Sequence, residues 1–328
     1  MTETLRIAPD PAGIADAAAL LREGALVAFP TETVYGLGAD ASNEAAVAKI
    51  FAAKGRPATN PLILHLPEAS MAAELAELPL AARRLAARHW PGPLTLVLRC
   101  RKNANIAPGI TAGLPTVALR VPMHPVARAL ILAVGRPVAA PSANLSGRVS
   151  PTSAAHVLDG LQGRIAAVVD AGPAPLGLES TILGFEDGRA VMLRPGALCA
   201  ETLEGTLRAP LGAAKPGKVS APGQLTSHYA TGARLRLNAA NPRPGEAWLG
   251  LGPVPPGVSG PALTLSRRAD LDEAAANLFG HLRALDAAIG GRGIIAVAEI
   301  PTTGLGRAIN DRLLRAAAPR QQPASRAG

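Results

Sequence analysis

Cysteine is nearly absent from this chain of 328 residues, which contains only Cys100 and Cys199. Neither has a neighbouring cysteine at the spacing of a metal knuckle or a redox pair. This scarcity excludes a disulfide scaffold and a zinc finger, because both need several closely spaced cysteines.

Long hydrophobic runs are also missing. No uninterrupted apolar segment approaches the roughly 20 residues that a membrane-spanning helix requires. Residues 1–10 lack the basic and apolar regions of a signal peptide. We therefore expect a cytoplasmic protein that does not interact with membranes.

Charged residues are few, at 17%, whereas hydrophobic residues make up 48% of the chain. This balance argues against a disordered chain and favours folded domains with hydrophobic cores. The length predicts about two domains. The formal charge of +9 is concentrated near the C-terminus: 14 Lys/Arg face 7 Asp/Glu from Lys215 onward, against 19 and 17 before it. Such an excess helps an anionic partner to dock, although an Arg-rich soluble surface gives the same count.

Strands and helices alternate along the first part of the sequence. Apolar periodicity and turn residues identify them. Predicted strands are 25–29, 62–64, 94–98, 117–121, 138–140, 166–169 and 191–193, and predicted helices are 14–21, 43–54, 68–88 and 126–134. This alternation predicts an α/β domain over residues 1–208.

A segment rich in proline and glycine follows, and its lack of periodicity predicts a linker over residues 209–232. A second, smaller α/β domain is predicted over residues 233–318. Its predicted strands are 235–237, 247–251, 262–265 and 294–298, with a helix over 270–289. Residues 319–328 are polar and aperiodic, which is typical of a flexible tail.

Three polar clusters lie at residues 30–38, 54–61 and 141–147, and the first and last directly follow predicted strands. Ligands of α/β sheets usually bind at such strand ends. Lys54 and Arg56 flank a glycine, so both cations can reach one anion, and phosphate is the natural candidate. The alternative is that they are solvated cations at a helix end.

Other residues of these clusters have structural alternatives as well. Residues 36–41 superficially fit the dinucleotide fingerprint G-x-G-x-x-A, but six residues separate the strand from the glycines, so we reject this interpretation. Ser142 and Asn144 are also common in helix caps and Asx turns. His65 can equally be a satisfied core histidine, and no histidine is assigned to a metal.

Taken in order, PTETVYGLG, KGRPATNPLILHL, TVALRVP, PSANLSG, PTSA, ESTIL and LRPG resemble the threonylcarbamoyl-AMP synthase family with its YrdC-like domain. The resemblance covers residues 21–196. The element Ser227-His228-Tyr229 and the trailing α/β segment resemble the longer, two-domain form. The implied fold is a twisted, open mixed sheet followed by a smaller Rossmann-like α/β domain.

The resemblance implies a nucleotidyltransferase that condenses L-threonine, bicarbonate and ATP into threonylcarbamoyl-adenylate and pyrophosphate. The product would serve a downstream transferase that makes threonylcarbamoyladenosine in tRNA, with tRNA itself a candidate contact. Mg²⁺ would bridge the ATP phosphates. A non-catalytic module that binds double-stranded RNA or tRNA is the alternative, whereas a hydrogenase-maturation carbamoyltransferase would need cysteine-rich zinc fingers.

The family's site residues can be carried over position by position. The resemblance places Lys54 and Arg56 at the reacting phosphates as catalytic residues. Around ATP it places Lys54, Arg56, Asn60, Thr116, Ser142, Asn144, Thr152, Arg194 and Tyr229. Around L-threonine it places Thr33, His65, Arg120 and Ser180. Tyr229 would belong to a lid formed by the linker, although Thr231 stands where the family commonly has proline.

Overall fold

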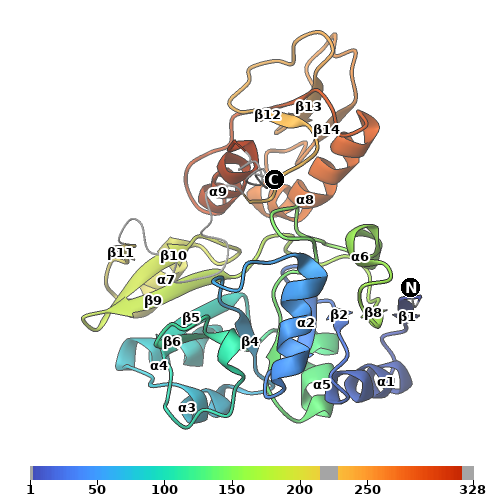
Figure 1. The fold of residues 1–328 in the computed structure, drawn as a ribbon. Coiled ribbons are helices and arrows are strands. Elements are labelled where there is room, and N and C mark those ends of the chain that lie inside the picture. Colours follow the sequence, from blue (N-terminus) through green and yellow to red (C-terminus); the bar gives the residue numbers. More distant parts are fainter. Residues whose placement is uncertain (1–2, 215–227, 320–328) are drawn as a thin grey trace, which may run out of the picture. The chain divides into compact units, whose positions relative to one another are not determined.

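The protein is described by a computed structural model over residues 3–214 and 228–319. Its contacts divide it into two compact units (Figure 1). Unit 1 contains residues up to 146 together with 150–214, and unit 2 contains 147–149 together with 228–319.

Part of the predicted linker, residues 215–227, lies outside the described residues, as do residues 320–328 of the predicted tail. The predicted end of the first domain at residue 208 and the predicted start of the second at residue 233 stay predictions.

Short, mostly buried strands build unit 1. They are β1 (Leu5–Ile7), β2 (Val27–Phe29), β3 (Gly36–Asp40), β4 (Ile63–His65), β5 (Leu94–Arg99), β6 (Thr116–Arg120), β7 (Val138–Ala139), β8 (Ala167–Val169), β9 (Thr181–Glu186), β10 (Arg189–Arg194) and β11 (Gly212–Ala213). Within residues 3–214 they form one eleven-stranded sheet in the order β1-β8-β2-β3-β7-β4-β6-β5-β9-β10-β11. Parallel pairs such as β4 with β6 and antiparallel pairs such as β5 with β6 both occur, so the predicted mixed sheet is confirmed.

The helices of unit 1 begin and end at recognisable signals. They are α1 (Pro11–Arg22), α2 (Glu44–Lys54), α3 (Ala72–Leu75), α4 (Leu80–His89), α5 (Pro125–Val134), α6 (Ala154–Leu161) and α7 (Ala200–Leu207). The Asn43 side chain caps α2 by accepting a hydrogen bond from the Ala46 amide. Gly55 ends α2 in the left-handed region at φ 59°, a conformation that favours glycine. This turn places Lys54 and Arg56 directly at the end of the helix.

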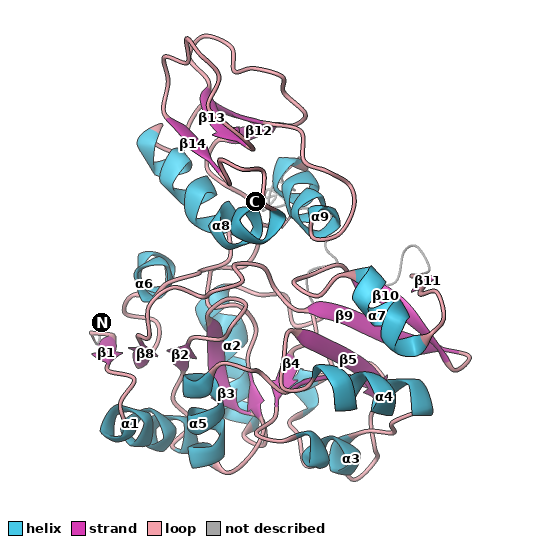
Figure 2. Ribbon diagram, turned by 180° about the vertical axis from the view of Figure 1, so that it is seen from behind, coloured by secondary structure: helices cyan, strands magenta, loops and turns pink. Residues whose placement is uncertain are grey.

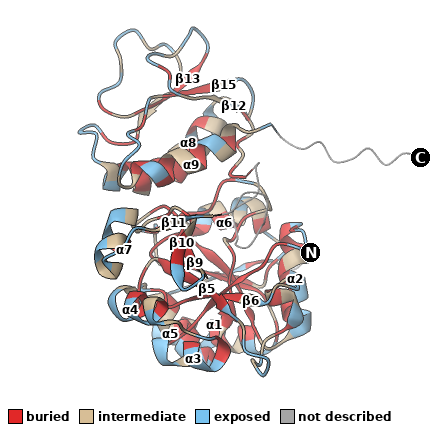
Figure 3. Ribbon diagram, turned by 90° about the vertical axis from the view of Figure 1, so that its left-hand side faces the viewer, coloured by how far each residue is buried: buried red, intermediate tan, exposed pale blue. Residues whose placement is uncertain are grey.

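The two faces of the sheet bury different sets of side chains. On one face, Leu64 and Leu119 belong to the main core, together with Ile50 of α2 and Leu85 of α4. On the other face, α1 and α5 lie side by side and cover the half of the sheet that contains β2, β7 and β8 (Figures 1 and 2). Buried positions accordingly concentrate along the strands (Figure 3).

The single helix predicted over residues 68–88 is wrong. The chain forms a short 3₁₀ turn and α3, then breaks before α4 begins at Leu80. Ala76 leaves the helix to form a β-bridge with Cys100, and the Glu77 amide donates to the Arg99 carbonyl oxygen. Pro79 is the N-cap of α4, a position where its missing amide hydrogen costs no helical hydrogen bond.

Residues 36–40 form β3 rather than a turn that cradles a pyrophosphate. Gly38 packs closely on its neighbours, because a Cβ there would lie 2.9 Å from the Phe29 ring. The glycines therefore serve packing, in agreement with our rejection of the dinucleotide fingerprint.

Unit 2 is a small parallel sheet with two helices. Its elements are β12 (Arg234–Arg236), β13 (Ala247–Gly250), β14 (Ala262–Thr264), α8 (Leu271–Ala288), β15 (Ile294–Val297) and α9 (Gly306–Ala317). The strand order β12-β15-β13-β14 confirms the predicted Rossmann-like α/β arrangement, while α9 was not predicted. None of the helices in the described parts of the chain is long and apolar enough to cross a membrane.

Candidate functional site

The register of β4 and β6 places two predicted site residues beside each other. His65 pairs with Arg120 in this parallel ladder, and Ile63 pairs with Ala118. Because side chains alternate along a strand, all four lie on the same face of the sheet. His65 and Arg120 end their strands, so they lie at the carboxyl end where ligands of such sheets bind.

The neighbouring strands add to this face. Val97 pairs with Ala118, and Thr95 pairs with Ile182 at the start of β9. Ile182 and Val97 belong to a small apolar cluster with Ile63 and Ala118. Thr95, together with Ser180 just before β9, places hydroxyl groups beside that cluster. The result is an apolar patch bordered by polar side chains.

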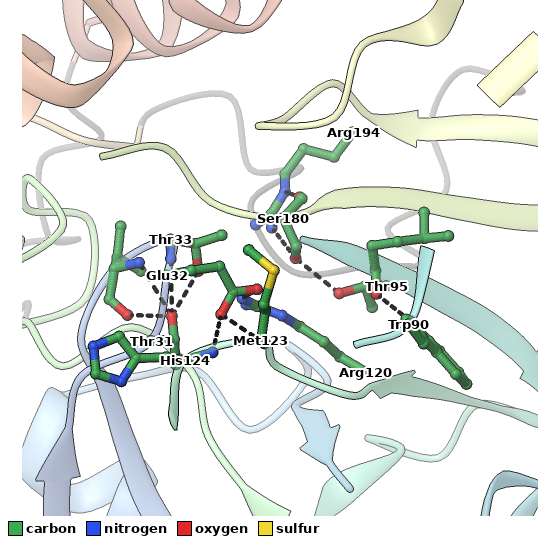
Figure 4. A network of polar contacts seen from close by, with 12 residues as sticks. Thr31, Glu32, Thr33, Trp90, Thr95, Arg120, Met123, His124, Ser180 and Arg194 are labelled. Carbon is green, nitrogen blue, oxygen red and sulfur yellow. Dashed lines mark hydrogen bonds and ion pairs between the residues drawn. The ribbon is translucent and has the colours of Figure 1, made fainter. Parts of the chain in front are cut away.

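A buried ion pair joins Glu32 to Arg120. The Arg120 Nη2 donates to Glu32 Oε1 at 2.7 Å, and the two side chains are only 4% and 2% exposed. The other carboxylate oxygen, Oε2, accepts the amides of Met123 (3.0 Å) and His124 (3.3 Å) (Figure 4). Burial opposes ionisation of Glu32, but the Arg120 charge and these hydrogen bonds outweigh it, so its pKa is lowered.

Two polar atoms of this region are buried without a hydrogen-bond partner among the described residues, namely Arg120 Nε and His65 Nδ1. Burial, aided by the Arg120 charge, lowers the pKa of His65 to about 3, so its ring is neutral. A buried donor or acceptor without a partner costs about 1–3 kcal/mol. A polar ligand would satisfy both atoms.

The hydroxyl groups of the 31–35 loop have a defined direction. Thr31 Oγ1 donates to the Val34 carbonyl oxygen at 2.7 Å and lies 2.7 Å from Thr33 Oγ1. A hydroxyl has one proton, so Thr33 must donate to Thr31. The Thr33 oxygen is then left with lone pairs, which suit an amine.

Arg194 and Ser180 form a second polar group. The Arg194 Nη2 donates to the Ser180 carbonyl oxygen at 2.8 Å, and Ser180 Oγ lies 2.7 Å from Thr95 Oγ1 (Figure 4). All three side chains are buried. The guanidinium therefore fixes the loop that carries the Ser180 hydroxyl.

The Lys54 ammonium holds the 142–144 loop. Its Nζ donates to the Ser142 carbonyl oxygen at 2.5 Å and to that of Asn144. An ammonium has three donors, so one N–H remains after these two bonds. Burial, with a smaller effect from the Arg56 charge, lowers the pKa of Lys54 well below its usual value.

Arg56 is buried and tied to its own loop. Its Nε donates to the Asn60 carbonyl oxygen at 3.2 Å, and its Nη2 donates to that of Pro61 at 2.8 Å. The Asn60 side chain is 2% exposed, and neither its Nδ2 nor its Oδ1 has a partner among the described residues. This amide is therefore a third group suited to a ligand.

Two further predicted residues, Thr116 and Thr152, have other surroundings. Thr116 begins β6, at the opposite end from Arg120, and lines a cavity of about 280 Å³ with Leu114 and Phe185. Thr152 Oγ1 lies 3.2 Å from His156 Nδ1. A wider groove of about 710 Å³, lined by Lys49 and ten other residues, contains none of the predicted site residues.

Tyr229 belongs to unit 2, and the residue is 1% exposed. It stacks on Phe279 with ring centroids 5.5 Å apart, and the Arg312 guanidinium lies 5.2 Å from the ring. Tyr229 is thus part of the packing of unit 2, and its contact with ATP stays a prediction.

Sequence reasoning missed Glu32 and Thr95. Glu32 lies inside the PTETVYGLG motif, where it is the one carboxylate directly after a buried strand. Thr95 interrupts the apolar run Leu94–Leu98 at a position that alternates with the core leucines. Both signals were present, but only the tertiary structure shows what each side chain contacts.

The described residues contain no group of three or more His, Cys, Asp or Glu side chains that could hold a metal ion. The buried carboxylate Glu32 is bonded to Arg120, and Glu179 accepts a hydrogen bond from Ser150 Oγ at 2.5 Å. The described side chains of unit 1 therefore offer no cluster that would hold Mg²⁺ without phosphate oxygens or water.

Fold and site together define a class: a YrdC-type mixed sheet with buried polar side chains at its strand ends, followed in sequence by a small Rossmann-like unit. The model of the Sua5/YciO/YrdC family, described as telomere recombination, matches residues 19–196. The model described as threonylcarbamoyl-AMP synthase, C-terminal domain, matches residues 198–318.

Relatives of known name align over most of the chain. Threonylcarbamoyl-AMP synthase of Bacillus subtilis strain 168 is 45% identical over 323 residues, covering 93% of this chain and 92% of the relative. That of Pyrococcus abyssi is 42% identical over 320 residues, covering 92% of each. The chain belongs to the threonylcarbamoyl-AMP synthase family, a family of enzymes that form an adenylate.

Solved structures agree with this assignment. The crystal structure of P. abyssi Sua5 complexed with L-threonine matches with a TM-score of 0.87 and 38% identity, covering 96% of this chain and 98% of that chain. E. coli YciO, at 24% identity and a TM-score of 0.54, shares the fold over 60% of this chain.

Proposed function

We propose that this chain condenses L-threonine, bicarbonate and ATP into threonylcarbamoyl-adenylate and pyrophosphate. Family membership supports the reaction class. The observation that carries the proposal is the buried Arg120, whose Nε has no partner among the described residues and lies in the polar part of the sheet face. A carboxylate is the ligand that a guanidinium N–H best accommodates in such surroundings.

The reaction has two bond-forming steps. The threonine amine attacks the carbon of bicarbonate, and hydroxide leaves with an amine proton as water. An oxygen of the resulting carbamate then attacks the α-phosphorus of ATP, and the bond from phosphorus to the pyrophosphate oxygen breaks. Neither step needs a covalent enzyme intermediate, so positioning and charge neutralisation are the main demands on the protein.

On the amino-acid side, Arg120 would bind the threonine carboxylate through its Nε–H. The Thr33 oxygen would accept a hydrogen bond from the amine, because its own proton is directed to Thr31. His65 and Ser180 would contact the remaining polar atoms. This division keeps the amine's lone pair available once a proton has left.

On the nucleotide side, Lys54 would offer its third N–H to a phosphate oxygen while its other two hold the 142–144 loop. A nearby phosphate would also counter the effects that lower the pKa of Lys54, so ATP binding would favour its protonated form. Arg56 and Arg194 would neutralise further phosphate charge, and the Asn60 amide and the Asn144 loop would contact the nucleotide.

Mg²⁺ would enter with ATP and be held by phosphate oxygens and water, since the described side chains offer no ligand cluster. We further propose that the adenylate is consumed by a tRNA threonylcarbamoyl-transferase. Both tRNA and ATP are available in the cytoplasm, where we place the reaction.

The decisive test is pyrophosphate release measured in the presence and absence of each substrate. We expect release that requires L-threonine and bicarbonate together, with a threonylcarbamoyl-adenylate mass in the product. Release of equal size without L-threonine would refute the proposal.

A further inference from the structure

Glu32 stands out because it is bound to a site residue from a neighbouring segment. Its Oε1 accepts from Arg120 Nη2 at 2.7 Å, and its Oε2 accepts from the amides of Met123 and His124. These amides follow β6, the strand that ends at Arg120. One carboxylate therefore ties both the guanidinium and the backbone beyond it to the 31–35 loop.

The pairing leaves Arg120 with a defined unused side. Glu32 takes a hydrogen from Nη2, while Nε is buried without a partner among the described residues. A guanidinium is planar and rigid, so fixing one nitrogen orients the others. Without Glu32 the side chain could rotate about its flexible stem, and the direction of Nε–H would no longer be set.

The backbone of Glu32 belongs to the same arrangement. Its carbonyl oxygen accepts the Leu176 amide at 2.9 Å, and the next residue is Thr33, whose hydroxyl is oriented by Thr31. Thus the groups that we assign to the carboxylate and to the amine of L-threonine are positioned from adjacent residues of one loop. Loss of the Glu32 carboxylate disturbs the Arg120 side of this arrangement and leaves the Thr31 to Thr33 bond in place.

We propose that Glu32 is a positioning residue for amino-acid binding: it orients Arg120 so that the Nε–H edge faces the carboxylate of the substrate. This inference rests on the proposed function, namely that Arg120 binds L-threonine. Glu32 itself touches no substrate. It acts through the direction of one N–H bond.

The test is calorimetric titration of the full-length protein with L-threonine and, separately, with ATP. We expect Glu32→Gln, which keeps the shape but removes the charge, to weaken L-threonine binding at least about tenfold and leave ATP binding within about twofold. The matched control is Asp40→Asn, because Asp40 is another buried carboxylate of unit 1 and accepts from Arg136 at 2.7 Å. Asp40→Asn should leave L-threonine binding unchanged even where it lowers the melting temperature.

A double-mutant cycle separates positioning from general destabilisation. The double variant Glu32→Gln, Arg120→Lys should bind L-threonine no more weakly than Arg120→Lys alone. In the Arg120→Lys background, Glu32 has no guanidinium to orient, so its loss should have no further effect on binding. Independent, additive losses would overturn the inference. Should Glu32→Gln not fold, Glu32→Asp carries the same test, with an expected loss of at least about fivefold from the shorter reach.

Two failures are distinguishable. If the unaltered protein does not bind L-threonine, the proposed function fails. If it does bind, and Glu32→Gln binds L-threonine equally well, the positioning role is overturned while the function stands.

Discussion

The guanidinium of Arg194 is hydrogen-bonded to Ser180 at two points: Nη2 lies 2.8 Å from the carbonyl oxygen and 3.3 Å from the hydroxyl. Under the proposed function, Arg194 binds ATP and Ser180 binds L-threonine. The two substrates therefore meet across one buried pair, and binding of one should alter binding of the other.

We expect Arg194→Ala to weaken the binding of both L-threonine and ATP. It should also reduce the effect of a non-hydrolysable ATP analogue on the affinity for L-threonine. Calorimetry with and without the analogue measures this coupling. In the unaltered protein we expect a several-fold effect, corresponding to about 1–2 kcal/mol. L-threonine affinity that is the same in both proteins, with and without the analogue, would contradict it.

Arg120→Ala should raise the L-threonine concentration needed for half-maximal rate and leave the ATP requirement nearly unchanged. The reason is that its assigned partner is the amino-acid carboxylate. Steady-state kinetics with each substrate varied in turn is the measurement, and Arg136→Ala, on another ion pair of unit 1, is the control. A selective loss of ATP affinity would reverse the assignment.

Lys54→Ala and Arg56→Ala should each slow adenylate formation, because each removes roughly 2–4 kcal/mol of transition-state stabilisation. Lys54→Ala should also loosen the 142–144 loop, because two of its carbonyl oxygens lose their donor. Lys49→Ala is the matched control, since Lys49 lies on the same helix and donates to the Gly24 carbonyl oxygen at 2.7 Å. Near-normal turnover of both site variants would refute their role.

Replacement of Tyr229 should separate packing from nucleotide contact. Tyr229→Ala removes the ring that stacks on Phe279 and should destabilise unit 2 by about 3–5 kcal/mol. Tyr229→Phe keeps the ring, so a loss of ATP affinity in that variant at an unchanged melting temperature would support the lid.

A chain that ends after Ala214 keeps every strand of the unit 1 sheet and should stay folded but bind ATP more weakly. Equal ATP affinity of the unaltered protein, the truncated chain and both Tyr229 variants would show that the linker is a tether and not a lid.

Stability of unit 1 should fall with acid partly through His65. Its pKa in the folded protein is about 3, below the value of 6.5 expected when unfolded. A group with a depressed folded pKa contributes stability that is present above pH 6.5 and is lost as the pH falls towards 3, here by roughly 5 kcal/mol at most. Denaturation at several pH values should therefore give a flatter dependence for His65→Gln than for the unaltered protein. His89→Gln should flatten the dependence less, because burial and the Arg88 charge lower the pKa of this half-buried histidine by a smaller amount.

Much of the architecture was already determined by local sequence. Asn43 and Gly55 mark the two ends of α2, and short apolar runs bounded by turn residues mark most strands, because capping and burial act within a few residues. The helix predicted over 68–88 failed, since the bridge from Ala76 to Cys100 is a long-range contact that no local pattern encodes. Gly36–Asp40 escaped notice as a strand because two of its five residues are glycines, which are uncommon in strands.

The ordered motifs identified the family, and the resemblance named Lys54, Arg56, Arg120 and Ser180 as candidate site residues. Their partners were decided only by tertiary structure. Glu32 contacts Arg120 across 88 residues of sequence, and Thr95 contacts Ser180 across 85, because the folded sheet brings distant strands and their loops together. Only the folded sheet, with its alternating faces, determines that His65 lies beside Arg120 while Leu64 and Leu119 turn into the core.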